Sequence, residues 1–185
     1  SKHHRNRNWA PAPQPLPEDA HVIDNHTHVA SVVPFSQAMR HEAMEKGQGE
    51  VPVYSVDELL EQAQKVGVEG VIDCGCELPN LMTAIDMARE HPGTVHAAIA
   101  IHPNESVLHG HRGVPGPDGL PLKYKPWHDT SFEDAMAEVH RLAITYPNQV
   151  VAIGETGMDL FRTGEAAKEL QREAFRAHIA LAKEL

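Results

Sequence analysis

Two histidines, His26 and His28, lie two positions apart directly after the apolar, β-favouring residues Val22 and Ile23. Alternate side chains of a β-strand point to the same face, so we expect both imidazoles to project from one face. Two neutral imidazoles side by side make half of a metal site. The pattern is common in proteins that bind no metal, so partner ligands elsewhere in the chain must support the interpretation.

Further polar residues follow two later apolar runs. His102 comes after the run at residues 95–101, and Glu155 and Asp159 come after the run at residues 150–154. In parallel α/β folds, ligands gather at the carboxyl ends of strands, so we expect these side chains to converge with the histidine pair. Histidines and carboxylates together suit zinc, manganese or other divalent ions. A carboxylate can bridge two ions, and Glu155 is the candidate bridge.

The elements that would position these side chains alternate between strand and helix. Short apolar runs predict one strand that ends near the histidine pair and three buried strands at residues 68–75, 95–101 and 150–154. Apolar residues at helical spacing, several behind a serine cap, predict helices that begin near residues 55, 79, 131 and 164. Between the first strand and the first of these helices, residues 31–53 are predicted to form a long loop, with a short helix over residues 34–45.

Four strand-helix units in succession predict an α/β fold with a parallel sheet and helices outside it. A doubly wound open sheet would suit the length. However, its glycine-rich phosphate turn is missing after the first strand, where the histidines stand instead. A TIM (β/α)8-type barrel, with active-site residues at its strand ends, fits better, and this chain would supply about the first half of it, four βα units.

Composition narrows the function further. The 185 residues are enough for one domain, and we expect residues 1–20 to form a proline-rich arm and residues 21–185 to form the barrel part. The net charge of -10 excludes the global basic surface of a general nucleic-acid binder. No apolar run reaches the length that a membrane span needs. Cys74 and Cys76 are too close for an unstrained disulfide, so we interpret them as small buried residues of a cytoplasmic protein.

Residues 104–130 are rich in glycine, proline and histidine, show almost no periodicity and exceed the usual length of a connection. Such a loop is either functional or mobile. The chain contains 14 histidines, and most of those away from the strand ends lie in polar or loop-like surroundings, where we expect them to be solvated. Examples are His3, His4, His41, His109, His111 and His128.

Taken together, these motifs resemble the TatD-type metal-dependent deoxyribonucleases of the amidohydrolase-like barrels. The resemblance depends on Ile-Asp-Asn-His-Thr-His at residues 23–28, Ile-Ala-Ile-His-Pro at residues 99–103, and Ile-Gly-Glu-Thr-Gly-Met-Asp at residues 153–159. The helix at residues 171–185 adds to it, so that most of residues 22–185 match in order and spacing. Departures are the proline-rich arm, the long loop, and Thr156 and Met158, where the family tends to carry aliphatic residues.

The resemblance implies roles for individual residues. His26 and His28 would bind one metal, Glu155 would bridge two divalent ions (zinc, magnesium or manganese), and His102 would lie beside the substrate phosphate. Asp159 would support this group of residues. Two metals about 4 Å apart would generate a hydroxide and stabilise in-line attack on a phosphodiester. The implied substrate is DNA, degraded from a 3′ end, with activity on single strands.

The remaining family ligands, two histidines and an aspartate, belong to the second half of the barrel. Nothing in the chain after Glu155 offers them, because His178 lies in the middle of a helix at a position that faces the core or neighbouring helices. We therefore expect this chain to be part of a longer enzyme of roughly 260 to 310 residues. Two alternatives stay open: an amidohydrolase-type hydrolase of a small ester or amide, and a truncated, non-catalytic module with weak metal binding or a partner chain.

Overall fold

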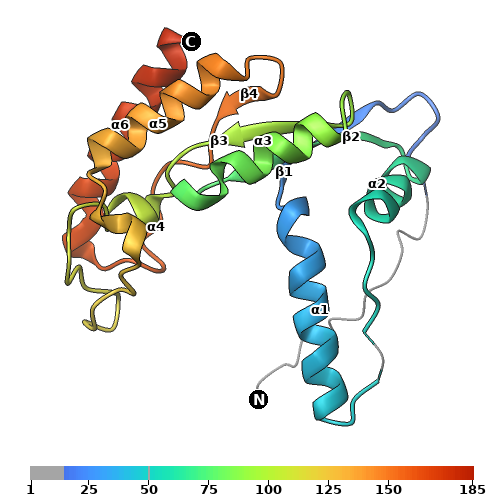
Figure 1. The fold of residues 1–185 in the computed structure, drawn as a ribbon, viewed down its shortest axis with the longest axis horizontal. Coiled ribbons are helices and arrows are strands. Elements are labelled where there is room, and N and C mark those ends of the chain that lie inside the picture. Colours follow the sequence, from blue (N-terminus) through green and yellow to red (C-terminus); the bar gives the residue numbers. More distant parts are fainter. Residues whose placement is uncertain (1–14, 50) are drawn as a thin grey trace.

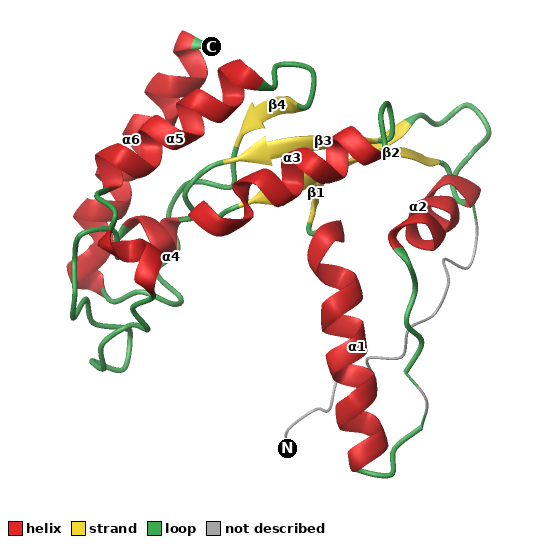
Figure 2. Ribbon diagram, in the orientation of Figure 1, coloured by secondary structure: helices red, strands yellow, loops and turns green. Residues whose placement is uncertain are grey.

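A four-stranded parallel sheet lies at the centre of the computed structural model, which describes residues 15–49 and 51–185 (Figure 2). The spatial order of the strands is their order in the chain, β1-β2-β3-β4. The strands are β1 (Val22–Thr27), β2 (Val68–Gly75), β3 (Val95–Ile99) and β4 (Val150–Ile153). This arrangement confirms the predicted α/β fold of four parallel βα units.

Helices connect the strands (Figure 1). They are α1 (Val29–Glu45), α2 (Val56–Lys65), the 3-10 turn η1 (Leu78–Asn80), α3 (Leu81–Glu90), α4 (Pro103–Ser106), the 3-10 turn η2 (Pro126–Asp129), α5 (Phe132–Thr145), the 3-10 turn η3 (Glu165–Ala167) and α6 (Lys168–Glu184). Helix α3 packs on β2 and β3, and α6 contacts both β4 and α4. The helices predicted to begin near residues 55, 79, 131 and 164 are all present.

Serine caps define two of these helix starts. The Ser55 hydroxyl accepts a hydrogen bond from the Glu58 main-chain N–H (3.2 Å), and the Glu58 carboxylate accepts one from the Ser55 N–H (2.7 Å). At α5 the Ser131 hydroxyl accepts from the Asp134 N–H (3.0 Å). These bonds satisfy main-chain donors that the first helical turn leaves without a partner, which is why the sequence pattern located both helices.

The core forms around the inner strand β3. Val95, Ala97 and Ile99 of this strand are 1%, 0% and 0% exposed. The side chains that pack with them come from β2, α3 and α5, and include Val71, Leu81, Ile85, Val139 and Leu142. A short apolar run inside a parallel sheet is buried on both faces, as predicted for this strand.

The outer strands differ from that expectation. Ile23 of β1 is 57% exposed and Val151 of β4 is 51% exposed. The prediction that residues 150–154 form a buried strand is therefore wrong. The reason is positional: within residues 15–49 and 51–185, β4 pairs only with β3 and β1 pairs only with β2, so each is an edge strand.

The region after the histidine pair is more helical than predicted. Helix α1 covers Val29–Glu45, whereas the expectation was a long loop with a helix only from residue 34. Figure 1 shows α1 extending away from the sheet, and only Val29, Ser36 and Ala43 are buried along it. A helix that buries so little has no strong apolar period, so its start cannot be recognised from spacing.

The loop at residues 104–130 is packed rather than loosely solvated. Its apolar residues form a second small cluster, which consists of Val107, Leu108 and Val114 with Ala167 from η3. The expectation that His109 and His128 are solvated is wrong, since they are 1% and 0% exposed. His41 and His111 are exposed as expected, and His3 and His4 lie outside the described residues.

Buried partners explain the two corrections. His128 Nε2–H donates to the Glu105 carboxylate (2.7 Å) while its Nδ1 accepts from the Lys125 N–H (3.0 Å). His109 Nδ1–H donates to the Thr130 carbonyl (2.9 Å). His128, whose two nitrogens both have partners, can be removed from water even in a loop without periodicity. His109 is buried with a partner at Nδ1 only, since its Nε2 has no hydrogen-bond partner among the described residues.

Two further sequence expectations concern a membrane-spanning segment and the N-terminal arm. In the part of the chain that the structure describes, no helix combines the length and apolarity that crossing a bilayer demands. Most of the predicted arm, residues 1–14, lies outside the described residues. At its end, the Leu16 N–H donates to the Val66 carbonyl (2.8 Å), beside the end of α2. The boundary at residue 20 stays a prediction.

Candidate metal centre

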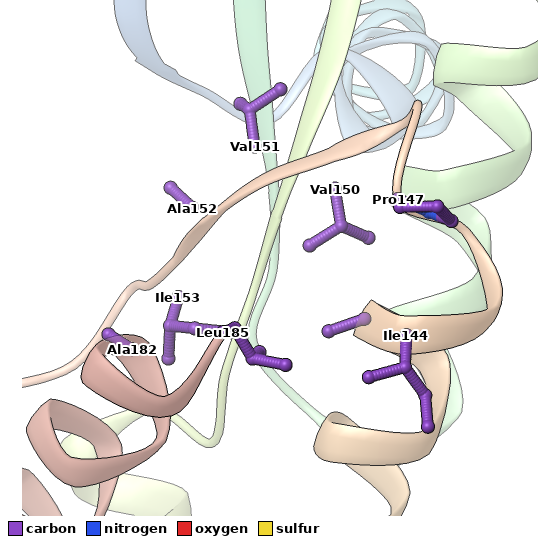
Figure 3. A pocket seen from close by; sticks show the side chains of 9 residues that line it. Ile144, Pro147, Val150, Val151, Ala152, Ile153, Ala182 and Leu185 are labelled. Carbon is purple, nitrogen blue, oxygen red and sulfur yellow. The ribbon is translucent and has the colours of Figure 1, made fainter.

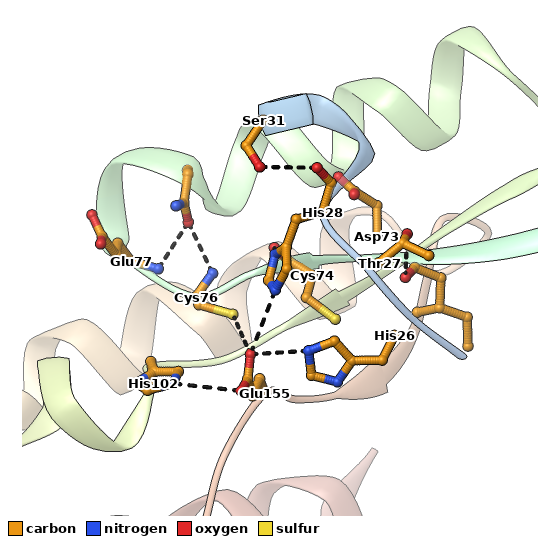
Figure 4. A network of polar contacts seen from close by, with 12 residues as sticks. His26, Thr27, His28, Ser31, Asp73, Cys74, Cys76, Glu77, His102 and Glu155 are labelled. Atoms are coloured by element: carbon orange, nitrogen blue, oxygen red, sulfur yellow. Dashed lines mark hydrogen bonds and ion pairs between the residues drawn. The ribbon is translucent and has the colours of Figure 1, made fainter. Parts of the chain in front are cut away.

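Three potential ligand atoms meet at one edge of the sheet (Figure 4). Glu155 Oε2 lies 3.2 Å from His26 Nε2 and 3.8 Å from His28 Nε2. Each of the three side chains offers one ligand atom, and all of these atoms lie within 4.8 Å of one another. His26 and His28 are exposed and Glu155 is half-buried, so an ion could reach them from solvent. The structure thus brings together the three residues that the sequence proposed as metal ligands.

Strand ends create this meeting point. His26 lies in the last part of β1, where pairing with β2 shifts register between Asp24 and Thr27. β1 ends at Thr27, so His28 is not on the strand but is the N-cap of α1. The two rings meet edge to face, with centroids 5.3 Å apart. Their proximity was predicted from strand alternation alone; in the structure it also depends on the irregular end of β1 and the start of α1.

Hydrogen bonding prepares His28 to act as a ligand through Nε2. Its Nδ1 lies 3.3 Å from the Cys74 carbonyl oxygen, which can only accept. The proton of the neutral ring therefore resides on Nδ1, and the lone pair of Nε2 faces Glu155. This arrangement, in which a carbonyl fixes the tautomer of a histidine, is typical of metal-binding imidazoles.

His102 is held in the opposite tautomer. It is the N-cap of α4, and its Nδ1 accepts a hydrogen bond from the Asn104 N–H (3.1 Å). In the neutral ring the proton therefore resides on Nε2, which lies 3.4 Å from Glu155 Oε1. His102 consequently presents a hydrogen-bond donor to the site, whereas His28 presents a lone pair.

Cys76 is a further neighbour of Glu155. Its Sγ donates a weak hydrogen bond to Glu155 Oε2 (3.6 Å). Burial raises the pKa of the Cys76 thiol to about 12, and burial together with nearby carboxylates raises the pKa of Cys74 to about 11. Both side chains are therefore neutral thiols at neutral pH. They are free, as predicted, but Cys74 is only half-buried, and the contact between Cys76 and Glu155 could not be recognised from the sequence.

Asp73 is a positioning residue that sequence reasoning missed. Its carboxylate, 1% exposed, accepts a hydrogen bond from the Val29 N–H (2.5 Å) at the start of α1. Burial raises the pKa of Asp73, although this hydrogen bond and one from the Ala30 N–H oppose the shift. Asp73 thus fixes the helix start that carries His28. A carboxylate in the middle of an apolar strand run was the available signal, because a buried charge requires partners.

Asp159 does not join the three ligand atoms. Its carboxylate accepts hydrogen bonds from Asn104 Nδ2 (2.8 Å) and from the Phe161 and Arg162 N–H groups (3.0 and 3.3 Å). Partial burial would raise its pKa, but these donors outweigh that effect and the pKa lies below its ordinary value. Asp159 is therefore hydrogen-bonded to Asn104, two residues after His102. Its supporting role stays a prediction.

Two hollows lie near the sheet edges. One, of about 590 Å³, is lined by His28, His102 and Glu155 together with Cys76, Asn104 and Arg162. The other is lined by apolar residues of α5, β4 and α6, among them Ile144, Val151 and Leu185, and contains none of the candidate ligands (Figure 3). The polar hollow is the one in which chemistry could occur.

Comparison with known proteins agrees with this fold. A parallel α/β chain with histidines and a carboxylate at its strand ends belongs to the class in which metal-dependent hydrolases are found. The sequence model described as "TatD related DNase" matches residues 23–185. The chain belongs to this family.

Curated relatives agree. A Bacillus subtilis protein named "Uncharacterized metal-dependent hydrolase YabD" is 30% identical over 130 residues, which cover 70% of this chain and 41% of that protein. The Rahnella protein named "3'-5' ssDNA/RNA exonuclease TatD" is 32% identical over 130 residues, covering 69% of this chain and 39% of that protein. The chain thus spans about two fifths of the length of these relatives.

A solved structure shows the same fold. The crystal structure of the Escherichia coli TatD homologue YJJV superposes with a TM-score of 0.56 at 22% sequence identity. The match covers 88% of this chain and 47% of that chain. This supports the interpretation of the four βα units as part of a TIM-type barrel.

Proposed function

We propose that the protein is a metal-dependent hydrolase that cleaves phosphodiester bonds of single-stranded DNA, proceeding from the 3′ end. The observation that carries the proposal is the meeting of His26, His28 and Glu155 at the carboxyl edge of a parallel sheet. Membership of the TatD-related family and the names of several relatives support the choice of substrate.

The donor set fits a divalent cation. His26 and His28 offer imidazole nitrogens and Glu155 offers a carboxylate, a combination that suits zinc or manganese and, through Glu155, magnesium. The two oxygens of Glu155 face different neighbours: Oε2 faces the histidine pair and Oε1 faces His102. We propose, as the family resemblance implies, that Glu155 would hold two ions. When bound, such cations supply Lewis-acid stabilisation of the charge that develops on a phosphoryl oxygen.

The chain's own residues orient the substrate. His102 Nε2–H, fixed by the Asn104 N–H at the other ring nitrogen, donates toward a phosphoryl oxygen. Asp73 and the Cys74 carbonyl hold His28 in place, so that its geometry does not need to reorganise when substrate arrives. Asp159 fixes Asn104 and thereby the segment that carries His102.

Hydrolysis of a 3′-labelled single-stranded oligonucleotide, with added manganese or zinc and with a chelator, tests the proposal. We expect cleavage that the chelator abolishes. His26→Ala and Glu155→Gln should each abolish cleavage and weaken metal binding in calorimetry, while His41→Ala, an exposed histidine on α1, should change neither. Cleavage that persists with the chelator, or without His26, contradicts the proposal.

The same assay separates the other reaction class. An amidohydrolase-type site would hydrolyse small esters or amides faster than oligonucleotides, so both substrates are compared at equal enzyme concentration.

We also propose a cytoplasmic location, because the two free cysteines suit a reducing compartment.

A further inference from the structure

Arg162 is shared by two neighbouring hollows. It lines the polar hollow at the candidate metal centre. It also lines a hollow of about 510 Å³ formed by residues 116–118 and 120–123 of the long loop, which is separate from the apolar hollow described above. Lys123 lines this loop hollow too, and Leu120 in its wall is 66% exposed. The two hollows therefore adjoin at one cationic side chain.

The turn that presents Arg162 is held firmly. Asp159 accepts from the Arg162 N–H (3.3 Å), and the Asp159 carbonyl accepts from the Thr163 hydroxyl (2.6 Å). Gln171 of α6, fully buried, donates to the Asp159 carbonyl (3.0 Å) and accepts from the Asp159 N–H (2.8 Å). The backbone under Arg162 is thus preorganised, which reduces the backbone entropy that this turn loses when Arg162 binds an anion.

The charges leave Arg162 and Lys123 available. Of the other carboxylates in the polar hollow, Glu77 pairs with Lys125 (3.4 Å) and Glu105 accepts from His128 (2.7 Å). Neither Arg162 nor Lys123 forms a salt bridge among residues 15–49 and 51–185, and both are exposed. Two carboxylates lie nearby: Asp159, whose pKa the Arg162 charge helps to lower, and Asp118, which lines the same hollow as Lys123 and accepts from the Leu120 N–H (3.0 Å). Two exposed cations without a salt bridge, beside apolar loop residues, suit a strand with charged phosphates and apolar base faces.

We propose that Arg162 and Lys123 form a binding track that guides the phosphodiester backbone of single-stranded DNA from the metal-centre hollow into the hollow of residues 116–123. Arg162 contacts the phosphate next to the cleavage site, and Lys123 contacts one further along the strand. This inference rests on the proposed function, and it assigns a task to the long loop that sets this chain apart from the family pattern.

Binding without metal tests the track separately from catalysis. In EDTA, fluorescence anisotropy measures binding of a labelled thymidine dinucleotide and of an oligothymidylate of about ten nucleotides, long enough for an extended site. Arg162→Gln should weaken binding of the longer probe about tenfold, the loss of one charge-assisted contact. Lys123→Gln should weaken the longer probe and leave the dinucleotide unaffected. Each variant should lower the salt dependence by about 0.7 in slope.

Lys65→Gln is the matched control, because Lys65 is an exposed lysine on α2 and lines neither hollow. Circular dichroism establishes that each variant is folded; Lys123 lies on an exposed loop, so its variant remains informative if Arg162→Gln unfolds. Wild-type protein that does not bind the longer probe, or variants that bind it as wild type does, would overturn the track.

The proposed function fails differently. Wild-type protein that binds the longer probe through both cations but hydrolyses neither probe with metal would refute the hydrolase and leave the track standing. Hydrolysis of the dinucleotide by wild type, together with unchanged binding in both variants, would refute the track and leave the hydrolase standing.

Discussion

The His178 imidazole on α6 accepts a hydrogen bond at Nε2 from the main-chain N–H of Ile101 (3.0 Å), the residue before His102. Its other nitrogen, Nδ1, donates to the Ala174 carbonyl one helical turn earlier (2.7 Å). His178 is 1% exposed, which confirms that it faces the core. Helix α6, late in the chain, thereby holds the segment after β3 that carries His102, the candidate hydrogen-bond donor to the substrate phosphate.

Replacing His178 should destabilise the protein. His178→Leu removes the acceptor of the Ile101 N–H and leaves that donor buried without a partner, a cost of about 1–3 kcal/mol. Urea unfolding, followed by circular dichroism, measures the free energy of unfolding. His111→Leu, at an exposed histidine, should change it little, and an equal loss in both variants would show that the Ile101 bond does not matter.

Stability should fall in mild acid. Burial lowers the pKa of His178 and of His109 below their ordinary value in the folded protein. The unfolded chain therefore binds more protons once the pH falls below about 6.5, and stability is lost by at most about 1.4 kcal/mol per pH unit for each histidine. Above that pH these two residues add no slope. Unfolding free energies between about pH 5 and pH 8 should be flatter in His178→Gln, which cannot titrate.

Asp73 should support both stability and metal binding. Asp73→Ala removes the acceptor of the Val29 N–H at the start of α1, and we expect a loss of about 1–3 kcal/mol. Because that start carries His28, metal affinity should also fall about 10- to 100-fold. Calorimetric titration with zinc or manganese measures it. Asp86→Ala, at a partly exposed aspartate of α3 that pairs with Arg89, is the control. Unchanged affinity in folded Asp73→Ala would argue against the positioning role.

His102 should separate substrate chemistry from metal binding. His102→Leu removes the Nε2–H donor but no proposed metal ligand, so hydrolysis should fall about 100- to 1000-fold while metal affinity stays near that of wild type. Parallel kinetics and calorimetry on the same preparation test this. A large loss of metal affinity would instead make His102 a ligand.

Glu105 should stabilise the long loop. Its carboxylate accepts from His128 Nε2–H (2.7 Å) and from Trp127 Nε1–H (3.0 Å). Glu105→Ala leaves two largely buried donors without an acceptor, and we expect a loss of about 2–4 kcal/mol together with a change in tryptophan emission. Glu61→Ala on the exposed face of α2 provides the comparison. Wild-type stability of Glu105→Ala would mean that the loop does not depend on this carboxylate.

The sequence was informative where a residue type and an apolar run coincided. His26, His102 and Glu155 each follow or end such a run, so their convergence could be predicted from the rule that parallel strand ends share one edge. Helices α2 and α5 were predictable because serine caps precede them. The exact roles of these side chains stay predictions.

Other features depend on tertiary contacts that leave no periodic signal. His109 and His128 are buried by partners within an irregular loop, and spacing cannot reveal such partners. Cys76 lies beside Glu155 only because β2 and β4 flank β3 in the folded sheet. Asp73 was overlooked inside the apolar run of β2. These residues show that positioning groups are harder to predict than the ligands they support.

Glu155 faces three histidines from two places in the chain: His26 and His28 at the end of β1, and His102 after β3. An ion held among His26, His28 and Glu155 would cross-link the first and fourth strands, which are not neighbours in the sheet. Separation of β1 or β4 from the sheet would release the ion. A higher ion concentration would therefore stabilise the whole sheet. Each tenfold excess of free ion over its dissociation constant would stabilise the closed sheet by about 1.4 kcal/mol, so the ion would have a structural role beside its proposed chemical one.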